Sequence, residues 1–199
     1  MPTKVEASWS IRPMKASDRA GLFHICVMTG DAGQSAEFQH YFPELQGLIY
    51  AEPYLAVPPC FGFVLVHTDL DGREEIVGCI VGTPDSRRFE AAAERNWYPS
   101  LRMKYPKSPY PLKATEADQK LIDLVHKPET TPQEVLNVSR AHIHIDLLPK
   151  AQRQGWGRKL MDKAVGYLST RGCNSLFVGI GELPSFSCMM WYCIVANAQ

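Results

Sequence analysis

The chain has 199 residues, of which 45% are hydrophobic and 21% charged, and this suits a single globular domain over residues 1–199 with a sizeable core. Its 21 basic and 21 acidic residues cancel, whereas a dedicated nucleic-acid binder carries a basic excess. No apolar run approaches the roughly 18–20 residues that cross a bilayer, and residues 1–6 lack the apolar stretch of a secretory signal. We therefore expect a soluble protein of the cytoplasm or nucleus that binds neither nucleic acid nor membrane.

The cysteines lie mostly inside apolar stretches such as Val77–Val81. No two of them have C-x-x-C spacing, which argues against a zinc knuckle or a thioredoxin-type redox site and predicts no metal. Six cysteines in a chain of this length favour buried free thiols over three disulfides. They are Cys26, Cys60, Cys79, Cys173, Cys188 and Cys193.

The N-terminal part predicts a strand followed by two helices. Residues 9–12 alternate apolar and polar side chains, as a half-buried strand does. Ser17 and Asp18 are typical of a helix N-terminus, and the helix they begin ends near the two glycines of residues 29–33. Such glycines suit a tight turn or the close approach of a ligand. Residues 35–50, rich in aromatic side chains, predict the second helix.

Two strands, 61–67 and 76–82, flank the hairpin turn Asp69–Gly72. Residues 88–97 have helical spacing. The segment 106–132 is rich in proline around one short helix, 117–126, and is either a lid or a wrapping loop. We interpret it as a substrate-side insertion and not a domain linker, because aromatic and apolar residues continue through it.

The C-terminal part predicts a βαβ unit. Residues 141–148 alternate as a strand does, a glycine-containing turn at 152–157 opens a helix, and residues 175–180 form another strand. A strand, a helix and a strand in this order imply two parallel neighbouring strands. Together with the hairpin before it, this unit predicts a mixed α/β sheet.

The turn Gln152–Gly157 fits the pattern Q/R-x-x-G-x-G/A. Its glycines allow a tight turn, and the free N–H groups at the start of the following helix bind a pyrophosphate. Arg153 and Arg158 add positive charge. The alternative is an ordinary turn with a solvated basic rim. Neither G-x-G-x-x-G nor the P-loop lysine pattern occurs, which argues against nicotinamide and nucleoside-triphosphate sites.

The strand, this turn and the helix together resemble motif A of the GNAT superfamily of acetyl-CoA-dependent N-acetyltransferases. Ile11–Pro13, followed by a capped helix, is similar to the usual GNAT start. Residues 29–33, 85–89 and 142–149 resemble a narrower branch, which includes the acetyltransferase-like domain of some O-GlcNAcases and its stand-alone microbial relatives. The resemblance implies the GNAT fold, a central and mostly antiparallel sheet with one splayed parallel strand pair, flanked by helices.

The resemblance also implies where acetyl-CoA binds, in the cleft between the splayed strands. Backbone groups at Asp146, Leu147 and Leu148 are expected to hold the acetyl and pantetheine arm. An amine, small or on a peptide, then attacks the thioester directly after losing a proton. The residues expected to hold the pyrophosphate are Gln152, Arg153, Gln154, Gly155, Trp156, Gly157 and Arg158.

The candidates for the base that takes this proton are His142, His144, Asp146 and Glu182. Period-two geometry places the first three on one face of a strand. An imidazole has a suitable pKa, whereas a carboxylate needs a pKa raised by burial. We prefer Asp146 and His144, with a structural role as the alternative for each histidine.

The sequence departs from the GNAT pattern after residue 181, where the usual asparagine, Gly-Phe pair and final hairpin are missing. Tyr192 matches by position the tyrosine that protonates the leaving thiolate in this superfamily, and a buried aromatic residue is the alternative. The altered C-terminus predicts an unpaired sheet edge, and hence a homodimer that covers it. It also keeps a second hypothesis open, a GNAT-like binding module without turnover.

On the acceptor side, Asp31 could attract a cationic amine, while Tyr54 and Trp97 could line the pocket. Core packing explains both aromatic residues equally well. Asp85 precedes a predicted helix, so a capping role is the preferred interpretation for it.

Overall fold

The computed structural model describes residues 7–180 and 190–195. Its centre is a six-stranded sheet in the order β1-β2-β3-β4-β5-β6. Neighbouring strands are antiparallel except for β4 and β5, which are parallel. The predicted mixed sheet with one parallel pair is therefore confirmed. The strands are β1 (Ser8–Pro13), β2 (Phe61–Thr68), β3 (Glu74–Thr83), β4 (His142–Leu147), β5 (Ser175–Ile180) and β6 (Met190–Val195).

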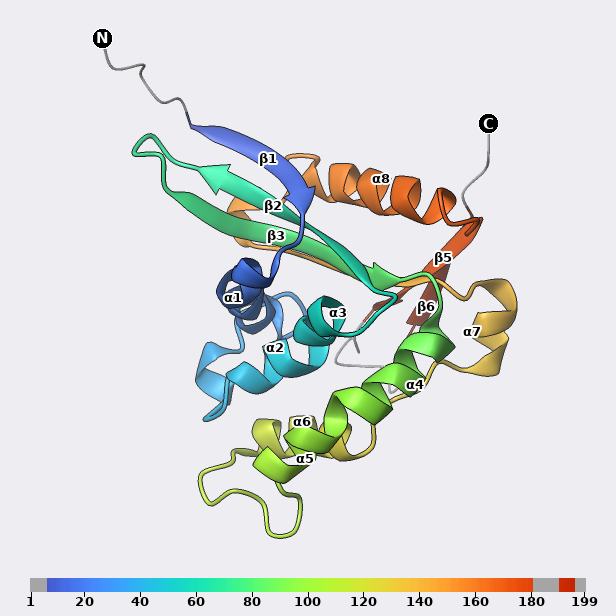
Figure 1. The fold of residues 1–199 in the computed structure, drawn as a ribbon. Coiled ribbons are helices and arrows are strands. Elements are labelled where there is room, and N and C mark those ends of the chain that lie inside the picture. Colours follow the sequence, from blue (N-terminus) through green and yellow to red (C-terminus); the bar gives the residue numbers. More distant parts are fainter. Residues whose placement is uncertain (1–6, 181–189, 196–199) are drawn as a thin grey trace.

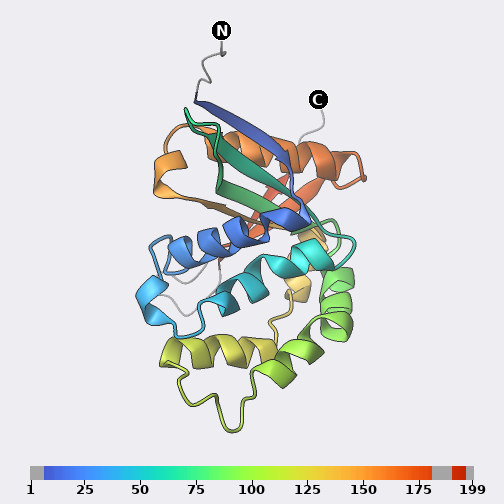
Figure 2. The ribbon, with the colours of Figure 1, turned by 60° about the vertical axis from the view of Figure 1, so that its left-hand side comes forward.

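Helices cover both faces of this sheet. The helix α8 lies on one face, α1 to α3 lie on the other, and α5 and α6 form a further layer beyond α2 (Figures 1 and 2). The helices are α1 (Arg19–Thr29), α2 (Glu44–Tyr50), α3 (Glu52–Ala56), α4 (Ser86–Asn96), α5 (Tyr98–Lys104), α6 (Glu116–His126), α7 (Gln133–Val138) and α8 (Trp156–Ser169). In the part of the chain that the structure describes, no helix is both long and apolar enough to span a membrane.

The main core lies between the sheet and the helices on its two faces. Leu22 and Ile25 of α1, Ile80 of β3 and Leu160 of α8 are all fully buried in it. Each such side chain contributes about 1.5–3 kcal/mol through its removal from water. The apolar residues that predicted these elements are therefore the ones that join them.

A second core joins the proline-rich segment to α2. Leu45 and Leu48 of α2 pack with Leu101 and Tyr105 and with the buried apolar face of α6. The segment is thus packed against the rest of the domain along its helix and does not hang from it as a loop.

The predicted helix over residues 35–50 is wrong in its first half. Only a single 3-10 turn, Glu37–Gln39, forms there, and His40 is extended. Pro43 stands immediately before α2. A proline fixes its own φ and disfavours helical geometry in the residue before it, so the helix begins only at Glu44.

A further strand does follow β5, so the outer strand of the described sheet at this end is β6. Strand β6 pairs with β5 along its whole length, from Ser175 opposite Val195 to Ile180 opposite Met190. The sequence did not indicate β6, because its apolar residues do not alternate. The helices α5 and α7 are further elements that the pattern did not separate.

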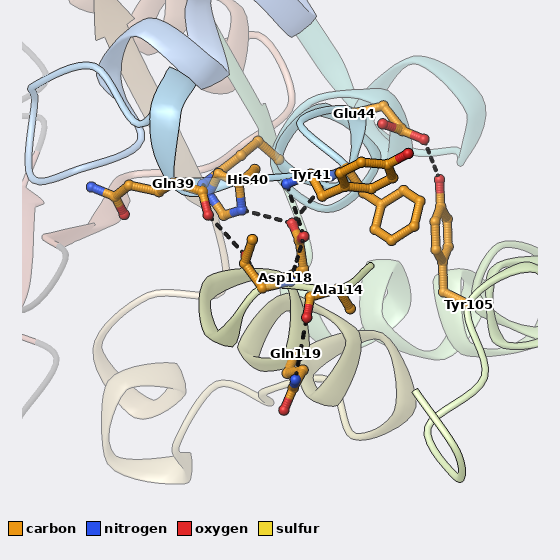
Figure 3. Close-up of polar contacts among 11 residues, drawn as sticks. Gln39, His40, Tyr41, Glu44, Tyr105, Ala114, Asp118 and Gln119 are labelled. Atoms are coloured by element: carbon orange, nitrogen blue, oxygen red, sulfur yellow. Dashed lines mark hydrogen bonds and ion pairs between the residues drawn. The ribbon is translucent and has the colours of Figure 1, made fainter. Parts of the chain in front are cut away.

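One buried carboxylate fixes α6 against the loop between α1 and α2 (Figure 3). Asp118 is 0% exposed and accepts backbone N–H groups of Tyr41 (2.9 Å), Phe42 (3.3 Å) and Thr115 (3.0 Å). The Nδ1–H of His40 donates to it at 3.0 Å, and Gln46 Nε2 donates to Nε2 of the same ring. Each ring nitrogen of His40 thus has one hydrogen-bond partner.

Burial alone would raise the pKa of the Asp118 carboxyl, but these hydrogen bonds outweigh it and hold the pKa below its usual value. The carboxylate is therefore ionised at neutral pH, with four donors around it. If loop residues 40–42 separated from α6, the Asp118 carboxylate would lose three of its four hydrogen-bond donors, which is costly for a buried charge.

We predict that Asp118→Asn lowers the free energy of unfolding by about 3 kcal/mol at pH 7, because four donors then face an uncharged amide. Since folding lowers the pKa of Asp118, this stabilisation is complete above about pH 4 and is lost as the pH falls through the folded-state pKa. Urea unfolding at several pH values measures it. The control is Asp123→Asn on the same helix, where the side chain is 47% exposed; equal losses in both variants would contradict the prediction.

Candidate active site

The parallel strands β4 and β5 separate soon after they meet. They pair only at His142 with Phe177 and at Ile143 with Val178. On its other side β4 stays paired with β3 as far as Leu147. Among residues 7–180 and 190–195, no strand pairs with the β5 side of residues 144–147. Backbone groups on that edge are available to a ligand, as unpaired strand groups require a partner.

Two of the expected backbone contacts are already used inside the protein. The Leu148 N–H donates to the carbonyl of Val77 at 2.9 Å. The Leu147 carbonyl accepts from Nε2 of Gln152 at 2.8 Å, although a carbonyl oxygen can accept a second hydrogen bond. The structure thus takes the Leu148 donor out of the expected set.

The turn after β4 has the backbone geometry that an anion site needs. Arg153 and Gly155 have positive φ angles of 59° and 80°. A Cβ at Gly155 would meet nothing within 4 Å, so its glycine serves the backbone angle and not close packing. The helix α8 begins directly afterwards at Trp156, and no side chain caps it. Its first N–H groups therefore face outward without a capping acceptor.

Side chains of the turn divide into two groups. Nε2 of Gln154 donates to the Lys150 carbonyl at 2.7 Å, as Gln152 does to Leu147, so both amides hold the turn in shape. Arg153 and Arg158 are exposed. The Trp156 ring stacks on Trp9 of β1 at 5.5 Å and lies under the Lys159 ammonium, so only its backbone remains for an anion.

His142, His144 and Asp146 lie on the sheet face that α1 and α3 cover, which confirms the prediction that they share a face. The rings of the two histidines are 5.6 Å apart, and Tyr54 of α3 contacts both. The Thr29 hydroxyl, at the end of α1, is 3.3 Å from Oδ1 of Asp146.

His142 has both ring nitrogens occupied. The Ser86 hydroxyl donates to the Arg140 carbonyl at 2.7 Å, so it accepts from Nδ1–H of His142, also at 2.7 Å. Nε2 then accepts from the Tyr54 hydroxyl at 2.7 Å. Burial holds the pKa of His142 well below its ordinary value. His142 is a neutral structural histidine, the alternative considered for it above.

Burial shifts His144 and Asp146 in opposite directions. It lowers the pKa of His144 to about 4, so this imidazole is a weak base. It raises the pKa of Asp146, an effect that the hydrogen bond from Thr29 partly opposes. Desolvation disfavours the charged form of either group. Of the two, Asp146 has gained proton affinity and His144 has lost it.

The three predicted acceptor-side residues lie in different places. Asp31 is exposed, accepts from Nε2 of Gln39 at 2.8 Å, and follows Thr29 by two residues, so it is at the Asp146 end of α1. Tyr54 is 6% exposed, with its hydroxyl on His142. The Trp97 indole donates to the Leu48 carbonyl at 3.0 Å and packs in the second core. Asp85 caps α4, as predicted, through Arg88 N–H.

Two further predicted residues lie towards the C-terminus. Glu182 is outside the described residues. Tyr192 is in β6, opposite Val178 of β5, and not at the end of a helix as the GNAT pattern implies. No individual role was predicted for Thr29 or Ser86. Both lie in segments, 29–33 and 85–89, that carry the resemblance to the O-GlcNAcase branch.

The four cysteines whose side chains the structure describes, Cys26, Cys60, Cys79 and Cys173, are free thiols, as predicted. Burial raises the pKa of Cys26 and of Cys60 to about 12, and it also holds the pKa of Cys79 well above its ordinary value. Cys79 is directly opposite Asp146 in the β3–β4 register. Thiols held protonated in this way are poor nucleophiles.

Comparison with known proteins agrees with this geometry. No family model matches the chain. The chain is 26% identical over 175 residues to the protein O-GlcNAcase of Rattus norvegicus and to that of Mus musculus, a match that spans 88% of this chain and 18% of those proteins. The crystal structure of SsHAT aligns with a TM-score of 0.72 at 31% identity, over 87% of this chain and 83% of that one. A GNAT family acetyltransferase from Brucella melitensis, in complex with acetyl-CoA, aligns at a TM-score of 0.46 and 12% identity over 96% of this chain and 90% of that one.

A mixed sheet with one diverging parallel pair, followed by a glycine turn and a helix without a side-chain cap, defines an acyltransferase-like fold. The similarity to SsHAT and the motif A turn together show that the chain belongs to the GNAT family of acetyltransferases. Its likeness to the O-GlcNAcases concerns a segment that is 18% of their length.

We predict that Tyr54→Phe lowers the free energy of unfolding by about 1–3 kcal/mol, because buried Nε2 of His142 then lacks its donor. Thermal or urea unfolding measures this. Tyr110→Phe is the matched control, since the Tyr110 hydroxyl donates to the half-exposed Asp123. A Tyr54→Phe protein as stable as the control would show that His142 has no need of this hydroxyl.

Proposed function

We propose that the protein transfers the acetyl group of acetyl-CoA to an amine by direct attack of that amine on the thioester. The single observation that carries this proposal is the separation of β4 from β5 beside the glycine turn. A strand edge with unpaired backbone groups suits an amide-containing arm, and the helix start next to it suits the pyrophosphate to which that arm is joined. No other described segment combines these two features.

The residues of this chain fit acetyl-CoA as a co-substrate. The left-handed turn at Gly155 turns the first N–H groups of α8 outward, and no side chain caps them. The exposed guanidinium groups of Arg153 and Arg158 are in place to add charge. When bound, acetyl-CoA supplies an activated acyl group, so the protein needs no nucleophile of its own.

The base that we propose is Asp146, with His144 second. An amine attacks only after it loses its proton, and the raised pKa of Asp146 suits a carboxylate to this task. Asp31, exposed near the same end of α1, would attract a cationic amine towards it. Tyr54 and Trp97 would support the acceptor site from the interior, because Tyr54 packs on His144 and Trp97 packs in the second core. The acceptor is a small amine or an amine on a peptide.

One observation favours the second candidate, a GNAT-like module that binds acetyl-CoA without turnover. Tyr192, the residue that matches the leaving-group acid, lies within strand β6. Calorimetric titration with acetyl-CoA, followed by a thiol-release assay against a panel of amines, separates the candidates. Tight binding with thiol release supports the enzyme, and tight binding without release from any amine supports the module.

A homodimer through the β6 edge stays a proposal, which light scattering tests.

We predict that Gly155→Asp weakens acetyl-CoA binding by at least ~10-fold, about 1.4 kcal/mol. The substitution places a carboxylate beside the pyrophosphate and forces a non-glycine residue into a left-handed conformation. The control is Gly72→Asp in the β2–β3 turn, which has a φ of 79° and equally open surroundings, so it matches both the strain and the charge. Calorimetry on both folded variants decides: equal affinities would exclude the turn as the pyrophosphate site.

For turnover, we predict that Asp146→Asn slows thiol release about 10²–10⁴-fold and leaves acetyl-CoA affinity within about 2-fold, because the base is lost and the turn is intact. If Tyr192 is the acid, Tyr192→Phe has a comparable effect on rate. Rate, affinity and melting temperature are measured together on each variant. A normal rate in Asp146→Asn would remove Asp146 as the base, and a normal rate with a lower melting temperature in Tyr192→Phe would make that residue structural.

A further inference from the structure

The hydroxyl of Thr29 lies within reach of two hydrogen-bond acceptors but has a single proton to donate. Oγ1 is 2.8 Å from the Ile25 carbonyl, one turn back in α1, and 3.3 Å from Oδ1 of Asp146. The first distance is that of a good O–H···O hydrogen bond and the second is longer than usual. The hydroxyl can donate to either oxygen atom, and the Ile25 carbonyl offers the shorter hydrogen bond.

Two oxygen atoms this close require a proton between them, and either residue can supply it. When Asp146 is ionised, the Thr29 hydroxyl turns and donates to Oδ1. When Asp146 has taken a proton from the acceptor amine, the carboxylic O–H donates to Oγ1, and the Thr29 proton returns to the Ile25 carbonyl. Only that one proton changes its covalent partner, from the amine nitrogen to Asp146.

The other titratable groups that face Asp146 offer it no positive charge. Cys79 on β3 and Cys26 on α1 are thiols whose burial keeps them protonated. His144, on the same strand, is neutral at pH 7 because burial lowers its pKa to about 4, and His142 is neutral too. None of the salt bridges among the described residues includes Asp146. Thr29 is the one described side chain that favours its ionised form.

The position of Thr29 is fixed from behind. It is the last residue of α1, and the next residue, Gly30, packs so closely on Gln46 that a Cβ there would lie 2.9 Å from Nε2. Gln46 in turn donates to His40, and His40 donates to Asp118 (Figure 3). The backbone at the end of α1 therefore cannot shift away from Asp146 without disturbing these contacts.

We propose that Thr29 is a positioning residue, which sets the proton affinity of the base Asp146 by donating to its carboxylate and by turning to Ile25 when the carboxyl is protonated. The proposal rests on the proposed function only in naming Asp146 as the base. A hydrogen bond to a charged acceptor is roughly twice as strong as one to a neutral group. Loss of the hydroxyl therefore costs the carboxylate more than the acid.

The test is a titration of the Asp146 carboxyl carbon by ¹³C NMR in the full chain without acetyl-CoA, with the resonance assigned through its absence in Asp146→Asn. Thr29→Val keeps the shape of the side chain and removes the hydroxyl. We expect it to raise the pKa of Asp146 by about one unit. In Thr29→Ser, which restores the hydroxyl, we expect the pKa to return to that of the unmodified protein.

Thr170→Val is the matched control, because Thr170 donates to a carbonyl in the last turn of α8 in the same way but far along the chain from Asp146. We expect no change there. If Thr29→Val leaves the pKa within about 0.2 units, or if Thr29→Ser shifts it equally, the proposal is overturned. Where Thr29→Val fails to fold, Thr29→Ala is titrated in its place against the same limits.

A second measurement separates this proposal from the proposed function. If the protein turns over, the acid limb of kcat/KM moves to higher pH in Thr29→Val by the amount that the titration gives, an approximately tenfold loss of rate below the pKa. Absence of thiol release from the unmodified protein would count against the enzyme. The titration would still decide whether Thr29 controls Asp146.

Discussion

Beyond Ile143, β3 is the one described strand that pairs with β4, and the geometry of the site depends on how the fold accommodates this half-paired strand. An unpaired strand edge inside a domain is costly unless something holds it open. Here β3 binds β4 closely: a Cβ at Gly78 would collide with the Leu147 side chain, so the glycine lets Leu147 pack across the neighbouring strand. Gln152 holds the Leu147 carbonyl from the turn. These contacts hold β4 against β3 where β5 no longer pairs with it.

The candidate base residues share one face of β4 because side chains alternate along a strand. Alternation directs His142, His144 and Asp146 towards α1 and α3, and it leaves Ile143 to the apolar core. Burial on that face acts on an acid and on a base in opposite directions. The same desolvation that weakens His144 as a base strengthens Asp146, so the environment selects between two residues that look equivalent in the sequence.

What could be predicted from the sequence is what neighbouring residues determine. The turn at residues 152–157 was found because its glycines, its strand and its helix are contiguous, and β4 because it alternates. Pro43 was overlooked as a helix boundary, although it acts on its immediate neighbours. The partnership of Thr29 with Asp146, and that of His40 with Asp118, could not be found, because these residues are 117 and 78 positions apart. Only the folded chain brings them together.

The two long-range partnerships are connected, and this gives the proline-rich segment a role in the site. His40 donates a hydrogen bond to Asp118 of α6 and accepts one from Gln46. Gln46 in turn packs against Gly30, the residue that follows Thr29. The side chains of Asp118, His40 and Gln46 are buried, whereas Gly30 lies at the surface. Because packed side chains transmit displacement, we expect a change at α6 to reach the end of α1, where the Thr29 hydroxyl faces Asp146. An insertion with its own apolar core thus constrains the geometry of the proposed base without touching it.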